Sequence, residues 1–160
     1  MGVINGKSET EFAPNDNVTR EEFVKMIVNL ADVNVEHGDV VFSDVTEGEW
    51  YYTPIKAAFQ KKIISGISET EFGVGKKITR QDMAVITANV LSYLKISVSK
   101  KNLDFADTDK IADYAKDAVS KLTAKGIING YEDNSFRPEG FATRAEAAKI
   151  LYGLLPLINR

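Results

Sequence analysis

Apolar side chains recur along this chain at intervals of three and four residues, the spacing of helices with one buried face. One such stretch follows Trp50 and a similar one begins at Tyr114. Gly66 follows the earlier stretch, where a glycine can end a helix. We therefore predict a helix in each stretch, with apolar positions Tyr51, Ile55, Ala58 and Phe59 in the earlier one and Tyr114, Ala115, Ala118, Val119 and Leu122 in the later one.

Three further helices are predicted to begin at Thr-Arg pairs. In each pair an acid stands three residues after the threonine, so that the hydroxyl and the acid can cap the first turn reciprocally. Two pairs carry Glu and form full capping boxes, whereas the middle pair carries the shorter Asp82. The capped positions are Thr19 with Glu22, Thr79 with Asp82 and Thr143 with Glu146; the apolar faces are Phe23, Met26, Ile27 and Leu30, then Met83, Ile86, Val90 and Leu94, then Ala147, Ile150, Leu151 and Leu154.

The chain repeats itself. Gly6, Gly66 and Gly130 are separated by 60 and then 64 residues, and the same intervals separate the Thr-Arg threonines. A fixed period of this kind indicates tandem structural units. A turn-rich connector (7–17, 65–77 and 129–140) links each glycine to its Thr-Arg pair, and we expect one phenylalanine to plug each connector: Phe12, Phe72 and Phe136.

A second block of the repeat occurs only twice. Phe42-Ser43-Asp44 matches Phe105-Ala106-Asp107, and Trp50 falls opposite Tyr114, each 16 residues before its glycine. The sequence therefore holds two and a half units. We interpret the missing block as trimmed from the first unit, and the alternative is that the domain begins with a half unit. We predict a partial first unit at 1–36, a second at 37–99 and a third at 100–160.

These patterns predict a mainly α fold of tandem helix–loop–helix repeats, in which the three capped helices form the shared core. Alternating stretches of strand type are brief and lie only near 34–42 and 96–105.

Composition narrows the function. Twenty Lys and Arg stand against 23 Asp and Glu, a balance that argues against nucleic-acid binding. There is no Cys and only one His, which excludes thiolate chemistry and leaves little for a multi-His zinc site or a Ser-His-Asp triad. No EF-hand loop, P-loop or other cofactor motif is present, so we expect neither a metal nor a cofactor.

No apolar run is long enough to span a bilayer. The first residues lack the basic and apolar regions of a secretory signal. The protein is therefore expected to be either intracellular or a form from which such a segment was removed.

Three arginines are less easily explained by folding. Arg20, Arg80 and Arg144 each occupy the first helical position, where the helix macrodipole disfavours a cation. An Arg beside free helix N–H groups would form an anion site. The structural alternative is an Arg that bridges to Asp44, Asp107 or another acid.

The remaining candidates also have structural alternatives. Asp44 and Asp107 could cap the following turn. The repeated glycines could adopt positive φ. Trp50 and Tyr114 could simply pack, although a flat ring near an Arg and a glycine is also typical of a sugar site.

Taken together, the order Phe-x-Asp, Trp, Ile-Ile-x-Gly, Phe-x-Pro and Thr-Arg-x-Glu closely resembles the S-layer homology (SLH) domain. The best copy is the third unit, with Phe105-Ala106-Asp107, Gly126-Ile127-Ile128-Asn129-Gly130-Tyr131, Phe136-Arg137-Pro138 and Thr143-Arg144-Ala145-Glu146. The resemblance implies three repeats in pseudo-threefold arrangement around a central three-helix bundle. It also implies non-covalent anchoring at the bacterial cell surface, outside the cell. The implied ligand is a secondary cell-wall polysaccharide, often pyruvylated, held in grooves between repeats.

By the same resemblance, binding involves the Arg of the Thr-Arg pair, the glycine, and the Asp and Trp of the earlier block. These are Arg20, Arg80 and Arg144; Gly6, Gly66 and Gly130; Asp44 and Asp107; and Trp50, with Tyr114 as its weaker counterpart. Val74 replaces the proline of the other connectors, and the first unit lacks the Asp and Trp block. At least one groove should therefore be incomplete.

We predict a carbohydrate-binding anchor without catalytic activity. The alternative is a structural module whose repeats mediate self-association in a surface layer. A glycosidase would need two carboxylates facing each other across a cleft, and the sequence places no such pair.

Overall fold

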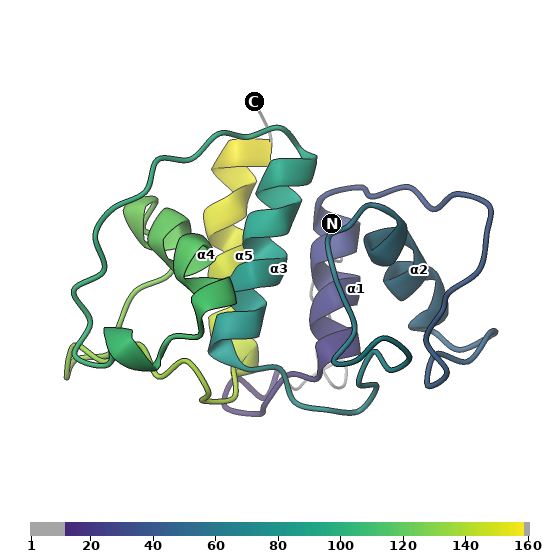
Figure 1. Cartoon of the computed structure of the whole chain (residues 1–160), viewed down its shortest axis with the longest axis horizontal. Coiled ribbons are helices and arrows are strands. Elements are labelled where there is room, and N and C mark those ends of the chain that lie inside the picture. The colour runs from purple at the N-terminus through teal and green to yellow at the C-terminus, as the bar shows by residue number, and fades with distance from the viewer. Residues whose placement is uncertain (1–11, 159–160) are drawn as a thin grey trace.

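A computed structural model describes residues 12–158, and Gly6 lies outside them. The described chain is mainly α-helical, as predicted (Figure 1). It forms no strand, only three isolated β-bridges, so the stretches near 34–42 and 96–105 remain irregular. The helices are α1 (Arg20–Leu30), α2 (Tyr52–Gln60), α3 (Arg80–Tyr93), the 3-10 helix η1 (Thr108–Lys110), α4 (Asp113–Ala124) and α5 (Arg144–Ile158).

Each helix of the Trp/Tyr block packs on the capped helix of the preceding unit. Thus α2 packs on α1 and α4 packs on α3, while α1 also contacts α3 and α5 (Figure 1). The predicted apolar faces supply the core, in which Phe23, Ile27, Met83, Leu122 and Leu154 are almost completely buried.

The three capped helices begin from a closed ring of backbone hydrogen bonds. The Val18 N–H donates to the Ala142 carbonyl (3.0 Å), Ala142 to Ile78 (2.9 Å) and Ile78 back to Val18 (2.9 Å). Each of these residues immediately precedes a capping threonine, so the ring fixes where each helix starts. Pseudo-threefold symmetry of the whole arrangement goes further than these three bonds and stays a prediction.

The caps form as the sequence predicts. Thr19 and Glu22 make a full capping box, and Thr143 and Glu146 exchange the same two bonds. At α3 only the Thr79 hydroxyl accepts, from the Asp82 N–H at 3.2 Å. The shorter Asp82 side chain is thereby left to make other contacts.

The predicted helix stop at Gly66 is wrong. Helix α2 ends at Gln60, and Lys62 adopts the left-handed conformation (φ 56°). The Ile63 N–H then reaches back to the Ala58 carbonyl at 2.8 Å, which closes a Schellman-type end. In α4 the equivalent position is Gly126 (φ 69°). The stop thus comes one turn earlier than the sequence suggested.

Candidate functional site

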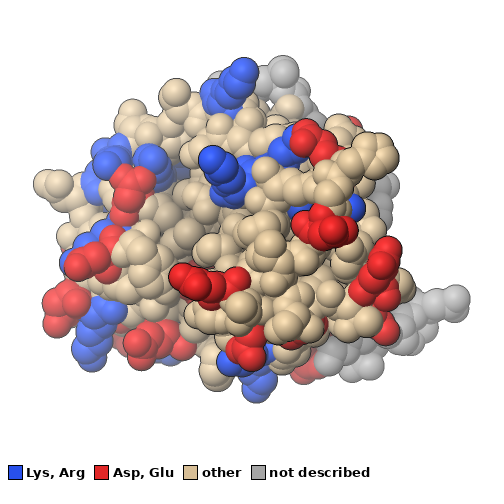
Figure 2. Space-filling model, turned by 45° about the vertical axis from the view of Figure 1, so that its right-hand side comes forward, with Lys and Arg blue, Asp and Glu red and all other residues tan. Residues whose placement is uncertain are grey.

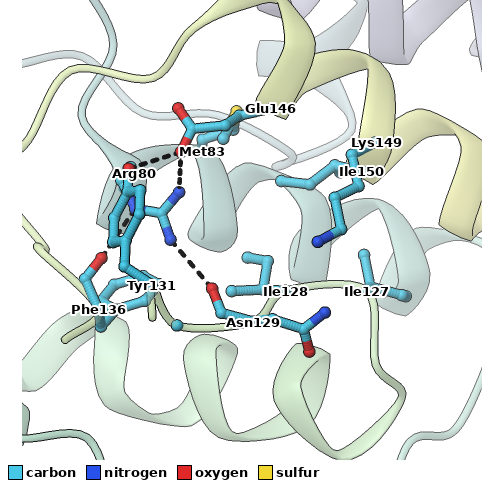
Figure 3. Close-up of a pocket in the computed structure, with 11 residues that line it drawn as sticks. Arg80, Met83, Ile127, Ile128, Asn129, Tyr131, Phe136, Glu146, Lys149 and Ile150 are labelled. Atoms are coloured by element: carbon cyan, nitrogen blue, oxygen red, sulfur yellow. Dashed lines mark hydrogen bonds and ion pairs between the residues drawn. The ribbon is translucent and has the colours of Figure 1, made fainter. Parts of the chain in front are cut away.

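The Arg80 guanidinium crosses from its own helix into the connector of the following unit (Figure 3). Its Nε donates to the Phe136 carbonyl (2.8 Å) and its Nη2 to the Asn129 carbonyl (3.2 Å), and its Nη1 pairs with Glu146. The guanidinium also lies over the Tyr131 ring, 4.6 Å from the ring centre. Only 7% of Arg80 is exposed, so the contacts of this cation are mostly within the protein.

Arg20 repeats this arrangement one unit earlier. It donates to the carbonyls of Phe72 (3.1 Å) and Ser65 (3.3 Å) and pairs with Asp82 (3.3 Å). Burial lowers the pKa of Arg20, and the Asp82 carboxylate partly opposes that effect. In the third copy, Arg144 donates to the Phe12 carbonyl (2.9 Å) and is likewise buried.

The structure therefore favours the bridging alternative for these arginines, with a different acid from those named in the sequence. Arg20 and Arg80 pair with the capping acids of the next helix, not with Asp44 or Asp107. The expected free N–H groups are also missing at α3. There the N–H groups of the first turn bond to the carbonyls of Gly140, Pro138 and Thr79 and to the Thr79 hydroxyl.

Asp44 and Asp107 hold the connectors in place. The Asp44 carboxylate accepts the N–H groups of Phe72 (2.8 Å), Gly73 (2.7 Å) and Val74 (2.8 Å). Asp107 does the same for Phe136 (2.7 Å) and the next residue. Burial raises the pKa of Asp44, but the three hydrogen bonds outweigh it, and the net pKa lies below the ordinary range. The bonded backbone lies in the connector, well beyond the adjacent turn that the sequence suggested.

Gly66 and Gly130 are required by close approach and do not have positive φ. A Cβ on Gly66 would lie 2.6 Å from the Phe42 ring and 2.3 Å from the Ser68 carbonyl oxygen. At Gly130 a Cβ would lie 2.9 Å from the Phe105 ring. The glycine is therefore required both by the phenylalanine ring of the Phe-x-Asp motif and by carbonyl oxygens of the connector itself.

Two equivalent cavities open beside these contacts. The Arg80 groove, of about 220 Å³, lies between α3, α5 and the third connector (Figure 3). Its polar and glycine lining comprises Arg80, Asn129, Gly130, Tyr131, Glu146 and Lys149. The Arg20 groove, of about 390 Å³, has the corresponding lining Arg20, Ser65, Gly66, Asp82 and Asn89, with Tyr114 added from the third unit.

The two aromatic candidates are exposed. Tyr114 is 61% exposed, and its hydroxyl donates to Asp82 Oδ1 at 2.8 Å. Burial and this hydrogen bond raise the pKa of Tyr114 to about 12, so the hydroxyl stays protonated at neutral pH. Trp50 is 48% exposed, and the Lys25 ammonium lies 4.9 Å from its ring centre. The structure thus brings Arg20, Gly66 and Tyr114 together, and Arg80 with Gly130, but Trp50 lines neither groove.

The buried phenylalanines are plugs, as predicted. Phe72 and Phe136 are fully buried beneath their connectors. Phe12 is 40% exposed.

Among the groove residues that the sequence did not predict, four make or face the main polar contacts: Asp82, Glu146, Tyr131 and Lys149. Asp82 and Glu146 were assigned only to caps, yet Glu146 serves both purposes. Its Oε2 accepts the Thr143 N–H (2.8 Å), while its Oε1 faces Arg80 and the Tyr131 hydroxyl. The repeated position of these acids, three residues after each capping threonine, was visible in the sequence, but it did not show that each acid pairs with the arginine of the preceding unit. Tyr131 and Lys149 carried no comparable signal, since their counterparts Ile67 and Val85 differ in chemistry.

Comparison with known proteins gives the family. A family model for the S-layer homology domain matches residues 1–24, 41–84 and 104–148, which is more than half of the chain. The chain belongs to the S-layer homology family. Each matched segment falls inside one of the three predicted SLH units, whose outer boundaries stay predictions.

Relatives with SLH segments are large proteins. The chain is 39% identical over 160 residues to exoglucanase XynX of Acetivibrio thermocellus. The match covers 98% of this chain but only 14% of that protein. It is 31% identical over 152 residues to the surface-layer 125 kDa protein of Lysinibacillus sphaericus, in a match that covers 93% of this chain and 13% of that protein. It is 28% identical over 144 residues to the cellulosome-anchoring protein of Acetivibrio thermocellus, in a match that covers 88% of this chain and 32% of that protein.

The chain thus spans less than a third of the length of these relatives. Because the shared part of the enzymes is the SLH region, it is an additional domain there. The SLH module itself is not an enzyme, as predicted from the sequence.

Proposed function

We propose that this chain anchors the protein that carries it non-covalently to the bacterial cell wall. Its ligand is a pyruvylated secondary wall polysaccharide, bound in the grooves between repeats. Membership of the SLH family and similarity to a cellulosome-anchoring protein and a surface-layer protein support this function. The function places the chain outside the cell. In the part described by the structure, no helix has the length and apolar content needed to cross a membrane.

The observation that carries the proposal is the repeated construction of the grooves. Each is an open cavity in which a buried Arg from one unit fixes the connector of the next. A glycine lets the backbone form the cavity wall, and an exposed Tyr stands at the rim of the Arg20 groove. Aromatic rings are suited to sugar faces, and polar side chains such as the asparagines that line each groove are suited to sugar hydroxyls.

Each groove contains only one carboxylate among its described lining residues, Asp82 in one and Glu146 in the other. Hydrolysis of a glycosidic bond usually requires two carboxyl groups flanking that bond. Both carboxylates are also engaged by an arginine. The groove chemistry therefore supports binding without turnover.

The test is co-sedimentation of the purified chain with extracted wall polysaccharide. Anchoring predicts that the chain pellets with the polymer and that no reducing ends are released. Oligomers that grow with protein concentration, without any affinity for the polymer, would support self-assembly in a surface layer instead.

A further inference from the structure

We propose that the two grooves recognise different features of the polymer: the Arg80 groove binds its carboxylate through Lys149, and the Arg20 groove binds uncharged sugar. This inference rests on the proposed function and identifies Lys149 as the residue that binds the carboxylate of the polymer.

Arg80 is already engaged by the protein. A guanidinium with a free edge would be suited to a carboxylate, because two parallel N–H groups can reach both oxygens. In Arg80, however, all three nitrogens already donate, to two carbonyls and to Glu146. Its charge is offset by that Glu146 carboxylate. Arg80 therefore holds the groove together and contributes little net attraction for an anion.

Lys149 is the second cation of the Arg80 groove. This side chain is exposed on α5, lines the cavity, and points its ammonium into the cavity opposite Arg80 (Figure 3). No carboxylate of residues 12–158 forms an ion pair with it. The Arg80 groove thus holds two cations and one carboxylate, and Lys149 is the cation whose charge is uncompensated.

The Arg20 groove has no lysine among its described lining residues. The position equivalent to Lys149 is Val85, so this groove holds one cation, Arg20, and one carboxylate, Asp82. The Asp82 carboxylate bonds on one side to Arg20 and on the other to the Tyr114 hydroxyl. With balanced charges, an exposed ring and the Asn89 amide, this groove matches a neutral sugar.

The experiment uses pyruvylated secondary wall polysaccharide, immobilised either intact or after conversion of its carboxylates to methyl esters. Affinities of the full chain are measured by biolayer interferometry. The wild type should prefer the intact polymer by about tenfold, the effect expected of one charge-assisted contact. Lys149→Gln should remove that preference and leave the affinity for the ester unchanged.

Two matched variants complete the design. Val85→Lys should enlarge the preference, because it adds the missing cation to the Arg20 groove. Lys125→Gln, an exposed lysine outside both cavities, should leave the preference at the wild-type level.

The outcomes separate the two proposals. A preference that survives in Lys149→Gln, or one that Val85→Lys leaves unchanged, overturns the assignment of Lys149 while anchoring stands. A wild type that binds both forms equally also overturns it. A wild type that binds neither form overturns the proposed function itself.

Discussion

The residue that ends a helix in the left-handed conformation differs between the two units: it is Lys62 after α2 and Gly126 after α4. Lys62 has a Cβ, which is strained in the left-handed conformation. The equivalent Gly126 has no Cβ and adopts the same conformation without that strain. The left-handed conformation destabilises a non-glycine residue by roughly 1–2 kcal/mol. A glycine avoids this strain but loses more conformational entropy on folding, so its net advantage is smaller. The same turn is therefore built with and without strain in one molecule.

We predict that Lys62→Gly raises the free energy of unfolding by about 0.5–1 kcal/mol and that Gly126→Ala lowers it by about 1 kcal/mol. Urea denaturation followed by circular dichroism measures both. Lys125→Gly is the control, because Lys125 has a negative φ of −88° and should gain nothing. Equal effects of the two lysine substitutions would contradict the explanation.

A second residue-scale prediction concerns pH. Burial raises the pKa of Glu146, but the Thr143 N–H, the Tyr131 hydroxyl and Arg80 together lower it below its ordinary value. Because the folded pKa lies below the unfolded one of about 4.3, this stabilisation is complete above that pH and is lost on further acidification.

Glu146→Gln should therefore cost about 1–3 kcal/mol at pH 7 and flatten the fall in stability between about pH 5 and 3. Chemical denaturation across this pH range measures the effect. Glu132→Gln, an exposed acid, should behave as the wild type. An unaltered acid profile in Glu146→Gln would show that this ion pair does not govern it.

At the scale of elements, the connectors carry the grooves and are held by one aspartate each. Three N–H groups converge on Asp44, and the glycine beside the Phe42 ring lets the connector lie close to the helix pair. The resemblance to SLH domains assigned these aspartates to ligand binding. The contacts described above suggest that their effect on binding is indirect.

We predict that Asp44→Ala lowers stability by about 2–3 kcal/mol and weakens binding in the Arg20 groove together, because the groove wall is lost. Thermal denaturation and polymer binding are measured on the same samples. Glu69→Ala, an exposed acid on the same connector, is the control. Full stability with lost binding would instead mean that Asp44 touches the ligand.

At the scale of the whole molecule, each groove is shared between units. The Arg20 groove takes Arg20 from the first unit, Gly66 from the second and Tyr114 from the third. In the Arg80 groove the tyrosine whose hydroxyl donates to the capping acid is Tyr131, which comes from the same unit as Glu146 and not from a further unit. Charges of both signs are interspersed on the face in Figure 2, in keeping with the balanced composition and without a continuous basic surface.

We predict that Arg20→Ala, Arg80→Ala and Arg144→Ala differ in their effect on polymer binding. Because each Arg fixes the connector that forms the wall of its groove, its loss from a complete groove should cost about 1.5–3 kcal/mol of binding free energy, and its loss from an incomplete one much less. Calorimetry measures the affinities. Because each Arg is buried, helical content must be checked for every variant. Three sites of equal affinity, each abolished by its own substitution, would contradict the prediction.

The sequence by itself determined the helices, their capped starts, the repeat and the family. These features depend on residues a few positions apart, such as Thr143 with Glu146, or on a pattern copied along the chain. Local spacing carries that information, so the mainly α fold and the plugs Phe72 and Phe136 were predicted correctly, whereas the third predicted plug, Phe12, is 40% exposed.

Only the tertiary structure decided where the functional side chains meet. Arg20 bonds to the Phe72 carbonyl, 52 residues away, and Gly66 is constrained by a ring of Phe42. Periodicity shows which face of a helix is buried, but it does not show which unit that face meets. The partners of the arginines, the roles of the aspartates and the place of Lys149 in a cavity depend on that pairing of units, which packing alone sets.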